Sequence, residues 1–310
     1  MAKEMPKESS KETTLASGLR FPEGPIALPD GRVLVVEIAR GTLSVVDTDG
    51  VVGVVAELGG GPNGAAMGPD GYCYVCNNGG FEWIEQGGKL YPGEQPEDYS
   101  GGRIERVNIT TGEYEVLYSE CDGISLKGPN DIVFDATGGF WFTDHGKSRP
   151  RERDRTGVFY AQPDGSDISE VIFPMEGPNG IGLSPDEDEL YIAETVPGRV
   201  WAYELESPGR LKGSGNRRLL VDRPGLHFFD SLAVDANGGV CVATILDGGV
   251  TTLMPDGSEP KFYATSDRLT TNICFGGADL KTAYITLSST GQLISTEWDI
   301  PGLPLNFLNK

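Results

Sequence analysis

Asparagine, whose side-chain oxygen can bind a cation, follows a Gly-Pro dipeptide at three places in the chain. The repeats are Gly61-Pro62-Asn63, Gly128-Pro129-Asn130 and Gly177-Pro178-Asn179, and each precedes a short apolar run. Carboxylate and amide oxygens suit a hard cation such as calcium, which accepts about 6–8 oxygens in irregular geometry. A single Gly-Pro-Asn is also typical of a turn in which Asn only caps the backbone. The chemistry therefore depends on whether the repeats converge in space.

Looser copies extend the repeat. Glu23, Asp230 and Thr271 stand at the equivalent place before further apolar runs. Each copy leads through a turn into a second apolar run, and successive copies are spaced by roughly 40 to 65 residues. Six such units, in a chain with 44 Gly and 21 Pro and little helical periodicity, predict an all-β, six-bladed β-propeller.

The predicted domain organisation is one propeller with a short tail. Residues 1–12 are polar and charged and are expected to be disordered, whereas residues 13–310 form the propeller. The last unit offers only three strands, so the N-terminal segment Thr13–Leu19 is expected to add the fourth and close the ring. The long insertion Phe81–Gly102 follows the second strand of the second unit and is expected to overhang the channel mouth.

Composition argues against several classes of partner. The net charge of -21 disfavours nucleic acid and anionic membrane surfaces, because their phosphates would be repelled. The segment Met1–Ser17 lacks the apolar core of a secretory signal, and no run approaches the length of a membrane helix. A cytoplasmic location is expected, with the five Cys as reduced core thiols. Cys73 and Cys76 lie three apart on a strand, so they face opposite sides and do not share a metal. The oligomeric state stays open.

Propeller geometry places the repeated position at one end of the central channel. Inner strands start at one mouth, and the antiparallel second strands end there. The expected ring comprises Glu23, Asn63, Asn130, Asn179, Asp230 and Thr271, and the rim around it includes Asn77, Asp144 and Glu194. The ring offers oxygen donors without Cys or His, which predicts one divalent cation: calcium, with zinc, manganese or magnesium as alternatives.

Several polar residues are expected to contact a substrate at this mouth. They are Asn63, Asn77, Asp144, His145, Glu194 and His227. For the two histidines the alternative is a solvated or structurally bonded imidazole. Arg149, Arg151, Arg153 and Arg155 alternate with other residues that include Glu152 and Asp154, and this run is expected to be an exposed loop rather than an anion site.

In this order the motifs resemble the SMP-30/gluconolactonase/luciferin-regenerating-enzyme family from about Leu19 to Leu308. The resemblance rests on segments 22–25, 128–132, 178–186, 230–235 and 298–304. It implies a six-bladed propeller with one divalent cation, usually calcium, whose ligands map onto Glu23, Asn130, Asn179 and Asp230. The family's usual reaction is hydrolysis of sugar lactones, and some relatives hydrolyse organophosphates. The chain departs from the family's sugar-lactone pattern at Lys127-Gly128-Pro129, which lacks a frequent Arg, and at Thr143-Asp144-His145, where Pro is common.

The residues also suggest a mechanism. A cation bound on one side polarises a lactone carbonyl, and a base must then activate water. Asp230 is the candidate base, Glu23 is the competing carboxylate, and direct nucleophilic attack by Asp is an alternative. The sequence therefore predicts a metal-dependent hydrolase of a small polar lactone. An organophosphate hydrolase on the same metal and a non-catalytic calcium-binding propeller are the alternatives.

Overall fold

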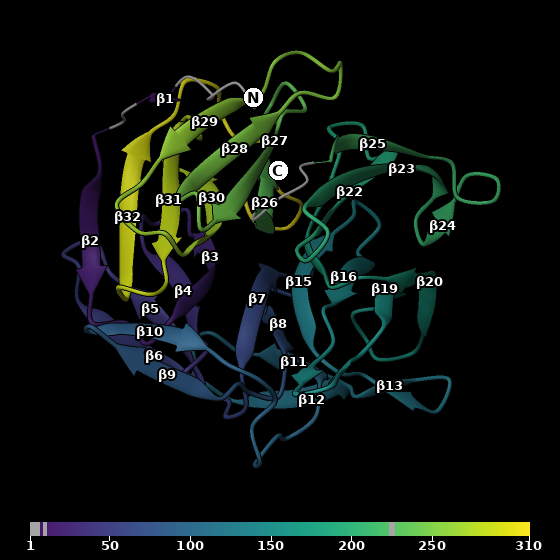
Figure 1. Ribbon diagram of the computed structural model, residues 1–310, viewed down its shortest axis with the longest axis horizontal. Coiled ribbons are helices and arrows are strands. Elements are labelled where there is room, and N and C mark those ends of the chain that lie inside the picture. The colour runs from purple at the N-terminus through teal and green to yellow at the C-terminus, as the bar shows by residue number, and fades with distance from the viewer. Residues whose placement is uncertain (1–6, 9–10, 223–226) are drawn as a thin grey trace.

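The computed structural model describes residues 7, 8, 11–222 and 227–310, and this part of the chain contains strands and no helix. Six sheets stand around a central channel, so the predicted six-bladed β-propeller is confirmed (Figure 1). Among the described residues there is accordingly no helix with the length and apolar character needed to span a bilayer.

Each blade has four antiparallel strands, counted here from the channel outward. Blade 1 consists of β3 (Pro22–Ala27), β4 (Val33–Glu37), β5 (Thr42–Val46) and β6 (Val52–Glu57). Blade 2 consists of β7 (Pro62–Met67), β8 (Cys73–Asn77), β11 (Arg103–Val107) and β12 (Tyr114–Tyr118). Blade 3 consists of β15 (Pro129–Phe134), β16 (Phe140–Asp144), β19 (Thr156–Ala161) and β20 (Ile168–Met175).

The second half of the ring repeats this order. Blade 4 consists of β21 (Pro178–Leu183), β22 (Glu189–Glu194), β23 (Arg199–Ser207) and β25 (Arg217–Asp222). Blade 5 consists of β26 (Phe228–Val234), β27 (Val240–Ile245), β28 (Gly249–Leu253) and β29 (Lys261–Ala264). Blade 6 consists of β30 (Thr270–Gly276), β31 (Thr282–Leu287), β32 (Gln292–Glu297) and, from the N-terminal side of the chain, β2 (Thr13–Ser17).

Short additional strands lie beside the four-stranded blades. They are the hairpins β9 (Trp83–Gln86) with β10 (Lys89–Pro92), β13 (Glu120–Cys121) with β14 (Ile124–Ser125), and β17 (Ser148–Arg149) with β18 (Glu152–Arg153), and the single strands β24 (Arg210–Leu211) and β1 (Lys7–Glu8). Strand β1 pairs parallel with β29. Most of the tail predicted over residues 1–12 lies outside the described residues, so its disorder stays a prediction.

Every inner strand carries a bulge at the repeated position. In β15 the pairing jumps from Pro129 to Ile132, while the partner strand β16 advances by only two residues. A slip of one residue also occurs at the start of β3, β7, β21, β26 and β30. Because a bulge bends the strand and re-aims side chains, the residues inside it leave the normal alternation of strand faces.

Glycines in the bulges let neighbouring inner strands approach closely. A Cβ atom on Gly24 would lie 2.6 Å from the carbonyl oxygen of Asn63 on the next blade. A Cβ atom on Gly180 would lie 2.6 Å from the carbonyl oxygen of Asp230. Moving backbone atoms to make room for a Cβ atom would cost much free energy, so only glycine allows this approach.

Apolar clusters fill the spaces between blades. Tyr74 of blade 2 packs edge-on against Phe134 of blade 3, with ring centroids 5.0 Å apart. Cys76 belongs to this cluster, whereas Cys73 packs in the cluster between blades 1 and 2. All five cysteines are free and buried. The prediction that Cys73 and Cys76 face opposite ways is therefore confirmed.

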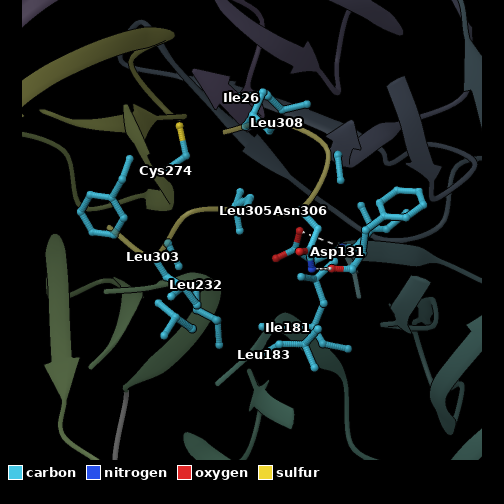
Figure 2. A pocket seen from close by; sticks show the side chains of 18 of the residues that line it. Ile26, Asp131, Ile181, Leu183, Leu232, Cys274, Leu303, Leu305, Asn306 and Leu308 are labelled. Atoms are coloured by element: carbon cyan, nitrogen blue, oxygen red, sulfur yellow. Dashed lines mark hydrogen bonds between the residues drawn. The ribbon is translucent and has the colours of Figure 1, made fainter. Parts of the chain in front are cut away.

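The C-terminal segment crosses the far end of the channel, opposite the bulges. Its Leu303 N–H donates to Val234 O, and the Asn306 amide donates to Phe134 O, at the last residues of β26 and β15. Figure 2 shows Leu303, Leu305 and Leu308 lining an apolar cavity there, together with inner-strand side chains such as Ile181 and Leu232. The wall of this cavity also includes the carboxylate of Asp131.

The substitution Gly180→Ala tests the close approach of blades 4 and 5. We expect it to lower the free energy of unfolding by about 1–3 kcal/mol, because the added methyl group overpacks against backbone. Urea denaturation measures the change. Gly53→Ala in the outer strand β6 is the control, since its Cβ would meet only Val45 Cγ1 at 3.6 Å. Equal stability of the two variants would contradict the steric argument.

Candidate metal centre

The six residues at the repeated position lie together at the mouth end of the channel, and all are buried. Direct contacts link two of them to residues of neighbouring blades. Asn272 of β30 donates from Nδ2 to Glu23 Oε2 at 2.7 Å, and Ser231 Oγ of β26 lies 3.4 Å from Asn179 Oδ1. Thr271 hydrogen-bonds within its own blade, to Thr286 and Ser288, and its hydroxyl also favours the charged form of Glu23. The ring therefore presents Glu23, Asn63, Asn130, Asn179 and Asp230.

Burial and mutual repulsion disfavour negative charge on the carboxyl groups of this ring. Burial raises the pKa of Glu23 to about 7, although hydrogen bonds from Asn272 and Gly24 act in the other direction. Burial, and then the charge of Glu23, raise the pKa of Asp230 well above its usual range. The same two causes raise the pKa of Asp131 to about 8. A divalent cation among these groups would let them ionise together.

The donor set fits a hard cation. The Oδ1 atom of Asn130 is buried and has no hydrogen-bond partner within the described chain, which leaves it available to a ligand. Among the described residues no group of three or more His, Cys, Asp or Glu side chains is placed to hold a metal. A site here would therefore combine the two carboxylates of Glu23 and Asp230 with the amide oxygens of Asn130 and Asn179, a combination typical of calcium.

Asp131 and Asn272 are members of this site that the sequence interpretation missed. Both follow directly after a ring position, at the place where blades 1, 2 and 4 have glycine. Asp131 Oδ1 accepts a hydrogen bond from the Ile132 N–H at 3.0 Å, and Asn272 Nδ2 holds Glu23. The departure from glycine in a repeated motif was the signal that could have indicated them.

The rim residues at the ends of the second strands hold the turns that carry the ring. Asn77 Oδ1 accepts the Gly61 N–H at 2.8 Å, and Glu194 Oε1 accepts the Glu176 N–H at 2.8 Å. The two oxygens of Asp144 accept the N–H groups of residues 127 and 128, each at 2.7 Å. These side chains thus position the segments that enter the inner strands. Their contact with substrate stays a prediction.

The two histidines occupy different parts of the mouth. His227 Nδ1 lies 2.6 Å from Asp247 Oδ2, with both side chains about one-third exposed. His145 follows β16, and its Nε2 lies 2.8 Å from Nη2 of Arg153. Both side chains therefore have partners within the protein, and their predicted contact with substrate stays untested.

The insertion after β8 runs along the mouth face from blade 2 toward blades 1 and 6. Trp83 of its hairpin packs on Phe21 with ring centroids 5.1 Å apart, and the Leu90 N–H donates to Ser289 O at 3.0 Å. Figure 1 shows this β9–β10 hairpin beside blade 1 and the end of blade 6. The insertion thus packs on the rim, not only on its own aromatic side chains.

Lys147 anchors the start of this insertion. Its Nζ donates to Asn78 Oδ1 at 3.0 Å and to Gly80 O, and it lies 3.9 Å from the ring centroid of Phe81. Burial lowers the pKa of Lys147 to about 7, although Asp144 and Asp154 favour its charged form. The insertion is therefore tied to the loop after β16 by a buried amine.

The sequence profile described as "SMP-30/Gluconolactonase/LRE-like region" matches residues 21–289 of the chain. The chain belongs to this family. The match covers all six inner strands and the whole ring, so the resemblance noted from the motifs is confirmed.

Named SMP-30/gluconolactonase relatives include hydrolases. The chain is 27% identical to the gluconolactonase of Zymomonas mobilis subsp. mobilis over 252 residues, or 76% of this chain and 64% of that protein. It is 25% identical to the diisopropyl-fluorophosphatase of Loligo vulgaris over 207 residues, or 62% of this chain and 65% of that protein. The matches thus span less than two thirds of either relative.

The fold is also found in solved structures. Regucalcin from Agrobacterium tumefaciens, a calcium-binding protein, superposes with a TM-score of 0.78 at 17% identity, covering 97% of this chain and 98% of that chain. This likeness shows the shared propeller fold. The family match together with the hydrolase relatives places the chain in a family that contains lactonases and other hydrolases.

The buried amine of Lys147 should make stability depend on pH. Its pKa is about 7 in the folded chain and about 10.4 in the unfolded chain. Between these values the unfolded state binds more protons, so stability rises with pH, by at most about 1.4 kcal/mol per pH unit. Urea denaturation at pH 7, 8 and 9 should show the stability of the parent protein rising relative to that of Lys147→Met, because all other titrating groups, including Asp131 and Asp230, are the same in both proteins.

Lys261→Met is the matched control, because this lysine is exposed on the outer strand β29. It should retain the parent's pH dependence. Parallel stability curves for the parent protein and Lys147→Met would contradict the assignment.

Proposed function

We propose that this chain hydrolyses a small polar lactone with the help of one divalent cation, calcium being the expected ion. The observation that carries the proposal is the ring of buried oxygens. Asn130 Oδ1 has no hydrogen-bond partner among the described residues, and burial and the charge of Glu23 oppose ionisation of Asp230. Glu23, Asn130, Asn179 and Asp230 would hold the ion. The gluconolactonase of Zymomonas mobilis, 27% identical over 252 residues, supports the substrate class.

The bound cation would supply Lewis-acid polarisation of the lactone carbonyl. The residues of the chain would do the rest. Asp230 would accept a proton from water as the water oxygen attacks the carbonyl carbon, and that proton would then pass to the ring oxygen as the ester bond breaks. The product is the open-chain hydroxy acid.

Asp230 is the better base of the two ring carboxylates. Glu23 Oε2 already accepts hydrogen bonds from Gly24 N–H at 2.8 Å and from Asn272 at 2.7 Å, so it is fixed as a ligand. Asp230 lies beside Asn179, whose amide favours its charged form. An amide at position 230 could still bind calcium, but it could not accept a proton.

Hydrolysis of an organophosphate is a second candidate function for the same ring. It is supported by the similarity to the diisopropyl-fluorophosphatase of Loligo vulgaris, at 25% identity over 207 residues. A cation that polarises a carbonyl oxygen can polarise a phosphoryl oxygen in the same way. Parallel assays of lactone opening and fluoride release from diisopropyl fluorophosphate would rank the two activities.

Removal of the divalent ion should abolish lactone opening. The ion supplies several kcal/mol of transition-state stabilisation, so turnover should fall by about 100-fold or more. The melting temperature should fall as well, because an ion that binds only the folded state stabilises it. Proton release and thermal denaturation, measured after treatment with EDTA and again after addition of calcium, test both effects.

Calcium-saturated EDTA is the control for effects of the chelator itself. Full activity in a preparation that elemental analysis shows to be free of metal would refute a metal-dependent reaction. An ion that restores the melting temperature without any hydrolysis would instead favour a calcium-binding propeller without catalytic activity.

The substitution Asp230→Asn separates metal binding from proton transfer. At saturating calcium we expect kcat to fall by about 10²–10⁴, the usual effect of losing a general base. Calcium affinity should weaken only partly, since the amide oxygen remains a ligand. Asn179→Asp is the matched change at another ring position and should cost less turnover. Calorimetric titration with calcium gives the affinities, and normal turnover by Asp230→Asn would reduce Asp230 to a ligand.

A further inference from the structure

The loop that follows β16 is basic within an acidic protein. Residues 145–155 contain five Lys or Arg and two Asp or Glu, whereas the whole chain carries a net charge of -21. Most of these cations are engaged. Arg149 pairs with Asp154 at 2.6 Å, and Arg155 pairs with Glu176 at 2.8 Å. Arg151 and Arg155 are exposed, as the prediction of an exposed loop expects, whereas Arg149 and Arg153 are half-buried.

Arg153 is different from its neighbours. Its side chain is partly buried. In the described part of the chain, no carboxylate oxygen lies within 4.0 Å of an Arg153 nitrogen, so Arg153 forms no ion pair there. Glu176 and Asp154 favour its charged form from farther away. Its Nη1 donates to Ser148 Oγ at 3.0 Å. Its Nε is buried without a hydrogen-bond partner among the described residues.

The contact of Arg153 with His145 fixes the state of the imidazole. A guanidinium can only donate, so Nε2 of His145, 2.8 Å from Nη2, must accept the hydrogen bond. The ring is then neutral and carries its proton on Nδ1. Burial, and next the charge of Arg153, lower the pKa of His145 to about 3, in agreement with this tautomer.

Within the described residues, one N–H donor of each of these two side chains has no hydrogen-bond partner. His145 Nδ1 is buried without a hydrogen-bond partner in the described residues, as is Arg153 Nε. The carbonyl groups of Gly177 and Pro178 favour the charged ring, but neither forms a well-aligned hydrogen bond with it. Buried donors without an acceptor are costly, which points to a ligand that accepts hydrogen bonds.

The donor pair stands beside the ring. The backbone N–H of His145 donates to Gly128 O at 2.8 Å, and a Cβ atom on Gly177 would lie 2.5 Å from Arg153 Nη2. Each of these glycines precedes a ring asparagine by two residues, a length of chain that spans at most about 7 Å. Arg153 and His145 therefore lie between Asn130 and Asn179 on the mouth side.

We propose that Arg153 and His145 form a subsite for a carboxylate carried by the lactone substrate. The assignment rests on the proposed lactone hydrolysis and adds the substrate class, an acidic rather than a neutral sugar lactone. A neutral imidazole and one guanidinium supply a single positive charge with several N–H donors, which matches a carboxylate monoanion better than a phosphate dianion. The local basic loop also offsets the repulsion of an anion by the protein's net negative charge.

Two lactones of the same ring size test the subsite. D-glucaro-1,4-lactone carries a carboxylate at the position where D-glucono-1,4-lactone carries a hydroxymethyl group. We expect the calcium-loaded parent protein to have a kcat/KM at least about tenfold higher for the acidic lactone, the size of a hydrogen bond to a charged group. In Arg153→Gln the ratio of the two kcat/KM values should fall by about 10- to 100-fold. Arg153→Lys should retain part of it because the charge remains.

Arg151→Gln is the matched control, since Arg151 is exposed in the same loop. It should leave both rates and their ratio unchanged. A preference for the neutral lactone in the parent protein, or an unchanged ratio in Arg153→Gln, would overturn the proposal while leaving lactone hydrolysis intact.

A direct binding measurement separates this proposal from the proposed activity. The chain has only two histidines, so the ring signals of ¹⁵N-labelled, calcium-loaded protein can be assigned with a His227→Gln variant. Titration with sodium acetate should shift the His145 ring signals saturably in the parent protein and not in Arg153→Gln, with sodium chloride as the control and sodium phosphate producing a weaker effect.

The two measurements fail in different ways. If His145 responds to acetate but no lactone is opened, the proposed activity fails and the carboxylate site stands. If lactones are opened but acetate leaves the His145 signals unmoved, the subsite is wrong and the activity stands. The titration of the parent protein needs no variant, so a poorly folded Arg153→Gln would not leave the proposal undecided.

Discussion

The crowding of buried carboxyl groups at one end of the channel is the constraint on which the rest of the site depends. Glu23, Asp131 and Asp230 each disfavour ionisation of another, and burial disfavours the charge on all three. Such an arrangement is expensive for folding alone. A cation shared among the groups would offset this cost. The surrounding elements hold the side-chain oxygens close together although their charges repel one another.

The features that hold the ring residues in place belong mostly to the backbone rather than to side chains. Bulges at the start of all six inner strands turn the ring residues away from normal strand alternation. Glycines such as Gly24 and Gly180 allow adjacent strands to approach. Side chains at the ends of second strands, including Asp144 and Glu194, then bind the N–H groups of the entering turns. The ring is thus held by three independent kinds of contact.

The fold could be predicted from the sequence because a repeated motif, each copy followed by a second apolar run, indicates the strand order directly. The repeated Asn and Asp positions could be placed in a ring for the same reason. Contacts between blades could not be predicted from the sequence, because they depend on bulges and on how closely two strands approach. Asp131, Asn272 and the position of Arg153 beside Gly177 all belong to this second kind. The rim residue Asn77 was recognised as polar and close to the mouth, but its bond to the turn at Gly61 follows from strand pairing that single residues do not reveal.

The C-terminal segment makes the two ends of the central channel different. Leu303, Leu305 and Leu308 lie across the end of the channel opposite the ring and line an apolar cavity, so the two ends of the central passage differ in chemistry. If the proposed reaction takes place at the ring, reactant and product would share the mouth on that side of the channel. In kinetic terms, a product that lingers occupies the place of the next reactant, so inhibition by product would be competitive.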